Sequence, residues 1–297
     1  MTARQAPPVV SSAGDIDNTI AAVKAFEYTP EYTSTKARLA SEAKAFDEAR
    51  AAFYATGKSD KQKYDVAVAA QQQYFATAKQ FNALEKSERD RMLRVLALPN
   101  EMRGVPDDII AGSYNATYRS AVTEATSIIS SLVHRDIMPR GITVSGVRDS
   151  RAYYTNSDRT IHINKNTDVS TIVHEIVHDI EYSHPDISRR TKEFLLKRSN
   201  GEPLKRLKDL TGIKAFKRHE VAYEDEWKKR GGSHYMGKWY DRPSTELLTM
   251  GIERLLKDAK TFQQQDPEYF RFMLEILRRA NSVSYTHLRA HETPEHL

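Results

Sequence analysis

The sequence contains no cysteine, so disulfide bonds and thiolate ligands are excluded and any bound metal must be held by histidine, aspartate or glutamate. Long hydrophobic runs are also missing, because the longest span only a few residues whereas a membrane-spanning helix needs about 20. The opening residues MTARQAPPVVSSAG lack the apolar segment of a signal peptide. We therefore expect no membrane association, no secretion, and a cytoplasmic location.

A large excess of one charge sign is missing as well. The formal charge of +5 is small for 297 residues and is spread over stretches of mixed sign, which argues against a nucleic-acid partner. The densest basic runs, residues 205–217 and 228–230, are expected to be solvated helix faces. With 39% hydrophobic and 29% charged residues, the composition is typical of a globular protein, and the length favours two domains.

The first third of the chain has a helical pattern. Residues 1–14 show no periodicity and are expected to be a flexible lead-in. A helix is predicted to begin at Thr29 and Pro30, to end near Gly57, and to carry apolar residues every seven positions: Tyr32, Leu39, Phe46 and Phe53. Further helices are predicted to open at Ser59 and Asp60 and at Ser87. We expect a helical hairpin or small bundle over residues 15–112, with the aromatic side chains serving packing.

The breaker-rich stretch PNEMRGVPDDIIAG, residues 99–112, is predicted to be the domain junction. Beyond it, residues 113–282 are expected to form a second domain that starts with a helix from Tyr114 to Leu132. The following elements are predicted to be strands at 142–146, 151–155 and 160–164, the last two forming a β-hairpin, then a helix capped by Thr167 or Asp168, and mainly helix beyond Ile187. The sequence therefore predicts an α+β fold.

The pattern H-E-x-x-H occurs once, at His174, Glu175 and His178. On a helix, positions i and i+4 lie one above the other, so both imidazoles can bind one ion at about 2.0–2.1 Å. Zinc lowers the pKa of a bound water towards about 7 and polarises a carbonyl, while a neighbouring carboxylate transfers the proton to the leaving amine. The motif therefore predicts Zn²⁺ ligands at His174 and His178, with Glu175 as the general base for peptide-bond hydrolysis.

A catalytic zinc site needs a third protein ligand, and the sequence offers two main candidates. His184 lies ten residues after His174, but the spacing that uses such a histidine has glycine where Glu181 stands, so a continuing helix would carry His184 away. Glu246, in PSTELLTMGIERL, is favoured because Ser244 or Thr245 can start a second helix that aims it at the metal.

Other residues near Glu246 have weaker predicted roles. Glu253 lies seven residues after Glu246 and is a fallback ligand, although a surface pair with Arg254 or Lys257 is the favoured interpretation. Tyr240 is the candidate catalytic hydrogen-bond donor to the oxyanion that develops on the substrate carbonyl, weighed against a half-buried structural role. Glu181 shares a face with the histidines and is a candidate to orient an imidazole.

The blocks HEIVHDIEYSHPDI, GKWYDRPSTELLTMGIERL and DPEYFRFMLEILRR resemble the zincin-like metallopeptidase domains of phage and prophage head-associated (minor head type) proteins. The similarity spans residues 151–279. The resemblance implies a gluzincin-like fold, zinc, and a role in a tailed phage particle or its assembly, in the host cytoplasm or the virion. It also implies that the helical N-terminal region is an attachment or assembly module, with phage structural proteins as partners beside a peptide or protein substrate.

The last residues have a different origin. Residues 283–293, VSYTHLRAHET, are similar to a translated sequencing adapter, and we expect residues 283–297 to be an artefact that replaces the natural C-terminus. Three histidines in this segment are therefore excluded from the site: His287, His291 and His296.

Two other classes of function remain open. A catalytically silent structural protein of the virion would hold zinc, if at all, in a closed four-ligand shell and would cleave nothing. A nucleic-acid-binding protein would bind through the basic runs with an affinity that falls steeply with salt. The sequence favours the peptidase over the structural protein, and places nucleic-acid binding last.

Overall fold

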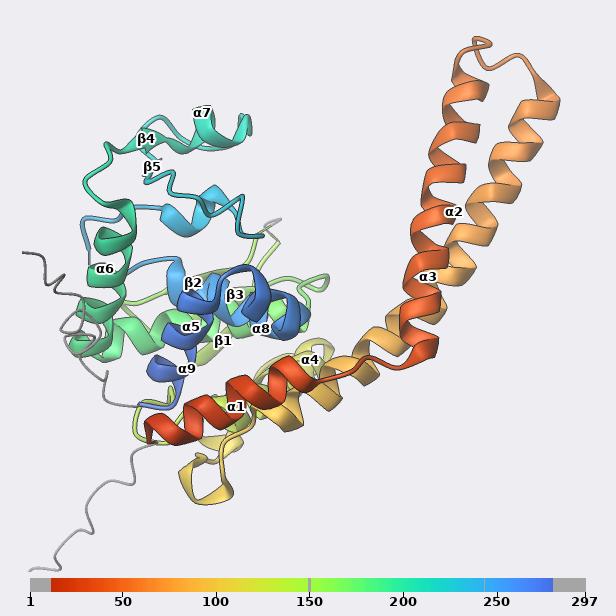
Figure 1. The fold of residues 1–297 in the computed structure, drawn as a ribbon. Helices are drawn as coiled ribbons and strands as arrows, with labels where there is room; N and C mark the ends of the chain where they lie inside the picture. The colour runs from red at the N-terminus through yellow and green to blue at the C-terminus, as the bar shows by residue number, and fades with distance from the viewer. Residues whose placement is uncertain (1–11, 149–150, 243, 280–297) are drawn as a thin grey trace, which may run out of the picture. The chain divides into compact units, whose positions relative to one another are not determined.

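The computed structural model describes residues 12–148, 151–242 and 244–279, and these form a mixed α+β structure in which helices dominate (Figure 1). The chain divides into two compact units. Residues 25–95 make up the hairpin unit, and the described residues before and after that range make up the main unit. The α+β class predicted from the sequence is confirmed. The expected artefact at residues 283–297 lies outside the described residues.

The hairpin unit consists of α2 (Pro30–Tyr54) and most of α3 (Lys61–Leu96). The predicted start is confirmed, because the Thr29 side chain accepts a hydrogen bond from the Tyr32 backbone N–H and proline takes the first helical position. Aromatic rings pair across the two helices at centroid distances of 5.3, 6.1 and 5.4 Å, in the pairs Tyr32–Phe81, Phe46–Tyr74 and Phe53–Tyr64. The helical hairpin predicted from the period-seven pattern is therefore confirmed.

One helix boundary in this unit was predicted wrongly. No new helix opens at Ser87, because α3 runs without interruption from Lys61 to Leu96. The stretch contains neither glycine nor proline, and a serine that can point to solvent does not end a helix. The neighbouring Glu88 has a structural role, since its carboxylate accepts hydrogen bonds from the backbone N–H and the hydroxyl of Thr29 at 3.1 and 2.6 Å.

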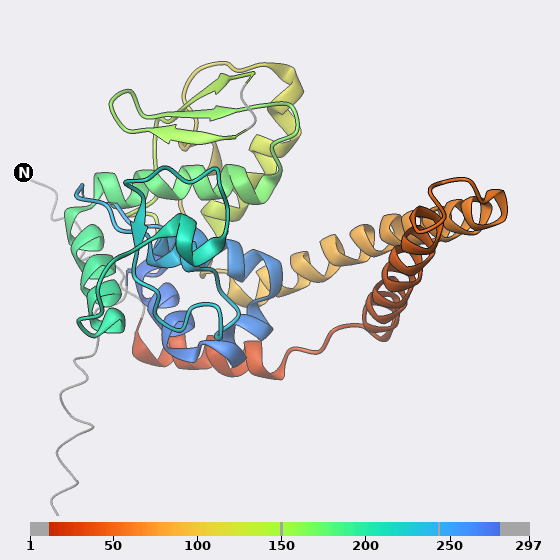
Figure 2. The ribbon, with the colours of Figure 1, turned by 90° about the horizontal axis from the view of Figure 1, so that it is seen from above.

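The main unit holds the remaining helices and the strands. Its longer helices are α1 (Ala13–Ala25), α4 (Arg119–Leu132), α5 (Val169–Ser183), α6 (Pro185–Ser199), α8 (Leu247–Gln265) and α9 (Pro267–Leu277). Its short helical turns are η1 (Asn100–Met102), η2 (Pro106–Asp108), η3 (Ala116–Tyr118), α7 (Leu207–Thr211) and η4 (His234–Gly237). Helix α5 is central, because it packs against α4, α6 and α8 and also contacts the sheet (Figure 2).

The main sheet has three short strands, β1 (Thr143–Gly146), β2 (Tyr153–Thr155) and β3 (Thr160–Ile163). Their order is β1-β3-β2, with β1 parallel and β2 antiparallel to β3. The predicted strands and the predicted β-hairpin are thus confirmed to within one or two residues. Strand β2 lies at an edge of this sheet and both hairpin strands contact α5.

Three boundaries in the main unit differ from the predictions. Ala13 and Gly14, expected in a flexible lead-in, lie in the first turn of α1, while residues 1–11 lie outside the description. The helix expected from Tyr114 begins later, as η3 and then α4, because the Asn115 side chain caps the chain at that point by accepting from the Thr117 N–H. The units separate near residues 24 and 95 rather than at Gly112.

The breaker-rich stretch after the hairpin unit packs with the main unit. Leu98 and Ile109 are fully buried, and the Leu98 backbone N–H donates to the Ser131 carbonyl of α4 at 2.8 Å. Prolines and glycines interrupt helices, but they do not prevent neighbouring apolar residues from joining a core. The end of the helical sequence pattern and the boundary between the two units therefore lie at different residues.

The prediction of mostly helical structure beyond Ile187 is correct only in part. After α6 ends at Asn200 in the left-handed conformation, residues 201–242 and 244–246 are largely irregular. They contain the two-stranded sheet of β4 (Lys205–Arg206) and β5 (Val221–Ala222), besides α7 and η4. The prediction missed this because basic residues on a loop and on a solvated helix face give the same composition.

A buried ion network holds the irregular segment in place. Arg198 of α6 donates to Asp225 at 2.7 Å and to Asp266 at 3.0 Å. Its guanidinium also lies 4.4 Å from the ring centroid of Trp227, which is fully buried. Charged groups that are buried and mutually paired fix a loop firmly, because separating them leaves uncompensated charge. The segment that leads to Glu246 is thereby tied to α6 and α9.

Within the described residues, none of the helices combines the length and the apolarity needed to cross a membrane.

Candidate metal centre

Helix α5 presents the H-E-x-x-H motif in the way its sequence requires. Asp168 caps the helix by accepting from the Thr171 N–H at 2.7 Å, one of the two caps predicted. The apolar face is fully buried, at Ile172, Val173, Ile176, Val177 and Ile180. Burial of that face fixes the rotation of the helix and directs the two histidines the other way.

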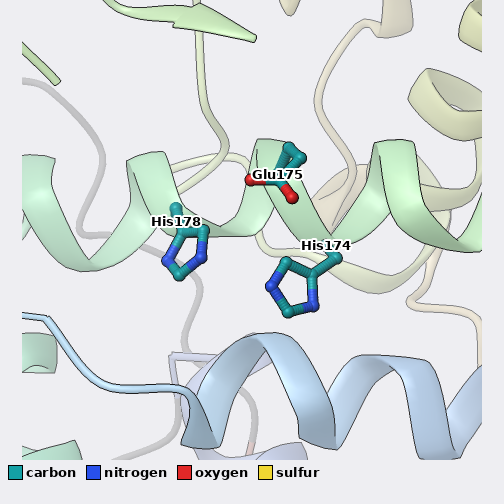
Figure 3. Close-up of side chains that lie close together, drawn as sticks. All are labelled: His174, Glu175 and His178. Atoms are coloured by element: carbon teal, nitrogen blue, oxygen red, sulfur yellow. The ribbon is translucent and has the colours of Figure 1, made fainter. Parts of the chain in front are cut away.

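His174 and His178 lie next to each other on α5. Their ring centroids are 5.0 Å apart with an angle of 79° between the planes. Figure 3 shows both imidazoles projecting from α5 towards α8, with Glu175 beside them. Potential ligand atoms of His174, Glu175 and His178 all lie within 4.8 Å of one another. The structure therefore brings the three motif residues together, as predicted.

Glu246 faces the two imidazoles from the start of α8. Its Oε2 lies 3.4 Å from Nε2 of His174 and 3.8 Å from Nε2 of His178. Ligands of a tetrahedral ion with bonds of about 2.0–2.1 Å lie roughly 3.3 Å from one another, so Oε2 of Glu246 lies from each imidazole nitrogen at about the separation expected for two ligands of one ion. Glu246 takes the N-cap position of α8, close to the predicted helix start, and its side chain is buried.

His184, the other candidate ligand, lies elsewhere. It marks the junction between α5 and α6, and its Nδ1 is 3.0 Å from the carbonyl oxygen of Ile180. It lines a separate hollow with Arg159 and Asp179. As the residue pattern implied, α5 continues through Glu181 without the glycine that would turn the chain back towards the histidines.

Glu253 orients His174 and is not a solvent-facing partner of Arg254 or Lys257. Its Oε1 lies 2.9 Å from Nδ1 of His174. Because a carboxylate only accepts, the Nδ1–H of His174 donates to it and Nε2 is the nitrogen that faces Glu246. The favoured sequence interpretation was therefore wrong, since α8 packs along α5 and turns the side shared by Glu246 and Glu253 inward.

Glu181 has a different role from the one predicted. It touches neither imidazole but accepts hydrogen bonds from the backbone N–H and hydroxyl of Thr245, at 3.0 and 2.8 Å, and from the hydroxyl of Thr191, at 2.5 Å. Burial raises its pKa to about 7 despite these bonds. Glu181 thus anchors the residue before Glu246 and positions that carboxylate indirectly.

Two tyrosines flank Glu246 on the other side. The Tyr240 hydroxyl donates to Oε1 of Glu246. The Tyr235 hydroxyl also interacts with Glu246 and Tyr240, and burial together with the Glu246 charge raises the pKa of both phenols. Both remain protonated donors at neutral pH. Tyr240 was singled out from the sequence, whereas Tyr235 was missed because it comes from an irregular segment where spacing gives no signal.

In the absence of a metal ion, the electrostatics of the cluster favour a neutral His178 and a protonated His174 beside an ionised Glu246. Burial lowers the pKa of His178 to about 4. Burial also opposes the charge on His174, but hydrogen bonds to Glu246 and Glu253 raise the pKa of that ring to about 10. Burial would raise the pKa of Glu246, yet the two histidines and Tyr240 bring it down to about 2. The carboxylates thus stabilise positive charge at His174, and a metal cation would take the place of the proton on its Nε2.

Glu175 has the properties of a general base. Burial, reinforced by the nearby charges of Glu246 and Glu253, raises its pKa to about 7 against the opposing effect of His174. A base works best when its pKa is close to the working pH. Among the predicted site residues, Glu175 is therefore the one matched to proton transfer.

The cluster opens into a cleft of about 1140 Å³. The sheet forms one wall, where the Tyr154 hydroxyl donates to Asp179 of α5 at 2.6 Å and its ring stacks near His178 with centroids 6.5 Å apart. Arg159 adds two bonds to the same carboxylate, at 2.9 and 2.7 Å. These contacts fix the β-hairpin above the histidines. They link residues 20 and 25 positions apart, and no local sequence pattern predicts contacts at such separations.

Comparison of the chain with family models, with curated proteins and with solved structures finds no match. The function proposed below therefore rests on the geometry and chemistry of these residues.

Proposed function

We propose that this protein is a zinc-dependent metallopeptidase that hydrolyses peptide bonds. The observation that carries the proposal is the approach of Glu246 Oε2 to both histidines, at 3.4 Å from His174 Nε2 and 3.8 Å from His178 Nε2. Two imidazole nitrogens and a carboxylate oxygen form a donor set that zinc accepts in catalytic sites. Glu253, bonded to the far nitrogen of His174, supplies the outer support that such ligands commonly have.

Three ligands, rather than four, favour catalysis over a purely structural ion. Within the part of the chain that the structure describes, the nearby groups have other partners: Glu253 bonds Nδ1 of His174, Tyr240 bonds Glu246, and His184 faces a different hollow. Structural zinc is usually enclosed by four protein ligands, whereas catalytic zinc keeps a position for water or substrate. The cleft supplies the access that a substrate needs.

The reaction proposed is addition of water to an amide. Bound zinc would supply a Lewis acid that lowers the pKa of water and polarises the scissile carbonyl. Glu175 takes a proton from the attacking water and passes it to the leaving nitrogen. A new C–O bond forms as the C–N bond breaks, giving one carboxylate and one amine. The Tyr235 and Tyr240 hydroxyls hold Glu246, and because a phenol has one proton, either would donate to the oxyanion only by releasing its bond to Glu246.

The edge of the sheet supports a peptide as the substrate. Strand β2 pairs with β3 on one side only among the described strands, and Tyr153 and Tyr154 of β2 line the cleft. An extended peptide can add to such an edge by backbone hydrogen bonds, whatever its side chains. The susceptible amide would then run past Glu175.

The resemblance to head-associated phage domains extends the proposal to a setting. In that setting the substrate is a structural protein of a phage particle, and the hairpin unit attaches the peptidase to it. Exposed large apolar residues on that unit are consistent with such an attachment: Tyr54, Tyr64, Val66 and Phe75.

The test compares the wild-type protein with Glu175→Gln, using zinc analysis and cleavage of a dye-labelled unfolded protein. We expect one zinc per chain in both and hydrolysis only in the wild type. Zinc in both with no hydrolysis by either would support the alternative, a catalytically silent structural protein of the virion. Equal hydrolysis by both would contradict the role of Glu175.

A further inference from the structure

The mouth of the cleft is lined by cations. Four exposed basic residues line it: Arg148, Arg151, Lys165 and Arg242. The acidic residues of the cleft are differently placed, since Asp168 caps α5 and the others surround the histidines: Glu175, Glu246 and Glu253. The cleft therefore has an acidic centre, suited to a metal ion, and a basic margin.

The four marginal cations have no ion-pair partner among the described residues. Basic residues on the outer surface of the same unit commonly do, as in Arg189 with Glu193 at 2.8 Å, Lys197 with Glu268 at 2.8 Å, and Arg206 with Asp209 at 2.7 Å. Cations that have no partner among the described residues and that gather around one cleft create a positive potential, which attracts and orients an anionic ligand.

Two of the cations lie close to the catalytic residues. Arg151 is within electrostatic reach of Glu175 and Tyr235. Arg242 is within reach of His178, and its guanidinium lies 5.0 and 5.9 Å from the ring centroids of Tyr240 and Tyr182. A guanidinium against aromatic rings is partly ordered before a ligand arrives, which reduces the entropy lost when it binds a carboxylate through two hydrogen bonds.

We propose that the cleft selects peptides with acidic side chains near the scissile bond, and that Arg151 and Arg242 bind those carboxylates. The selection of cleaved bonds rests on the peptidase function proposed above, whereas the binding of acidic peptides does not. The side chains of a peptide paired with β2 would alternate between the two faces of the added strand, so isolated carboxylates can reach the margin.

A nucleic acid is the other polyanion that tyrosines and arginines can bind, but the centre of the cleft disfavours it. Glu175, Glu246 and Glu253 line the same cleft as the marginal cations. A phosphate backbone carries a charge at every nucleotide and would meet these carboxylates, whereas a peptide can place uncharged backbone there. An acidic peptide is therefore the ligand that matches the charge pattern.

The first experiment measures cleavage specificity with a library of peptides from a digested proteome. We expect aspartate and glutamate to be enriched within about three residues of the cleaved bonds. Arg151→Glu and Arg242→Glu should each remove the enrichment on one side of the bond and favour lysine or arginine there. The control, Arg189→Glu, reverses a charge on the outer surface and should leave the profile unchanged. An unenriched wild-type profile, or identical profiles in all variants, would overturn the proposal.

The second experiment measures binding without catalysis, in the Glu175→Gln background. Fluorescent nine-residue peptides that carry two glutamates, two lysines or two glutamines in the same alanine-serine host are titrated, with a thymidine oligonucleotide as competitor. We expect the glutamate peptide to bind best, and each of Arg151→Gln and Arg242→Gln to weaken it by about three- to tenfold. Arg189→Gln should have no effect.

The two measurements test the preference for acidic peptides and the peptidase activity separately. Tight binding of the glutamate peptide with no hydrolysis by the wild type would remove the peptidase and keep the acidic-ligand cleft. Hydrolysis that depends on Glu175, with equal binding of all three peptides, would keep the peptidase and remove the acidic preference. Preferred binding of the oligonucleotide would overturn the choice of ligand.

Discussion

The hairpin unit and the main unit differ in how they use buried polar groups. The hairpin unit is held mainly by aromatic pairs along two helices, with the buried Glu88 bonded to Thr29 where α2 begins, and large side chains such as Phe75 stay exposed. The main unit buries carboxylates, among them Glu181 and Glu246, and pairs each with donors from other elements. A short repeat of apolar residues is enough to form a helical hairpin. The site instead requires charged groups from distant segments to be held close together, although these groups repel one another and are better solvated in water.

Removal of zinc should show this difference most strongly. A metal that binds only the folded state stabilises it by RT ln(1 + [L]/Kd), or about 4 kcal/mol when its concentration is 1000 times Kd. We expect chelation to abolish hydrolysis and to speed amide hydrogen exchange in residues 168–183 and 244–256. Exchange in residues 30–95 should not change. Equally faster amide exchange in both units, or no change in either, would contradict the prediction that zinc stabilises only the main unit.

Glu253→Ala should weaken the metal site without changing a metal ligand. Loss of the bond to Nδ1 frees the His174 ring to rotate, and outer-shell changes of this kind commonly cost about 10- to 100-fold in metal affinity. The measurement is a zinc titration against a competing chromophoric chelator. Glu193→Ala, which removes an exposed carboxylate of α6, is the matched control and should keep the wild-type affinity. Equal affinity in the two variants would show that Glu253 does not support His174.

Thr245→Val should destabilise the main unit by about 1–2 kcal/mol, because it leaves the buried Glu181 without the hydroxyl that bonds it at 2.8 Å. The change preserves the shape of the side chain. Urea unfolding of the metal-free protein, followed by a tryptophan signal, measures the effect because both tryptophans lie in the main unit. A change under about 0.3 kcal/mol would contradict the anchoring role.

Phe75→Ala should have the smallest effect. Its side chain is 57% exposed in the hairpin unit, and surface substitutions usually change stability by less than about 0.5 kcal/mol. The change in stability is measured by thermal unfolding, with helix content followed by circular dichroism. A loss of several kcal/mol would mean that this residue is buried in solution, for example against a second chain.

Much of the hairpin unit could be predicted because its signals are local. Thr29 with Pro30 marks the start of α2, and the aromatic members of the seven-residue repeat mark the side whose rings pair with α3. The error at Ser87 arose because serine was taken as a helix start although α3 contains no residue that breaks a helix. A capping residue followed by proline identifies a true helix start reliably. A serine alone does not, because serine also occurs within helices.

The site could be predicted only where its members are close in sequence. Spacing of four residues on one helix places His174 and His178 together, and the same geometry explains why His184 is turned away. The roles of Glu253, Tyr235 and Glu181 depend on how α8 and the irregular segment pack against α5. That packing is set by buried apolar surface and by the Arg198 network, which no short pattern contains.

The convergence of Glu246 on the two histidines is the central claim, and zinc content of matched variants tests it most directly. The wild type, Glu246→Ala and His184→Ala would be equilibrated with a weak chelator, checked for folding by circular dichroism and analysed by mass spectrometry for bound metal. One zinc per chain in the wild type and in His184→Ala, with little in Glu246→Ala, is the predicted result. Full zinc in Glu246→Ala, or none in the wild type, would contradict it.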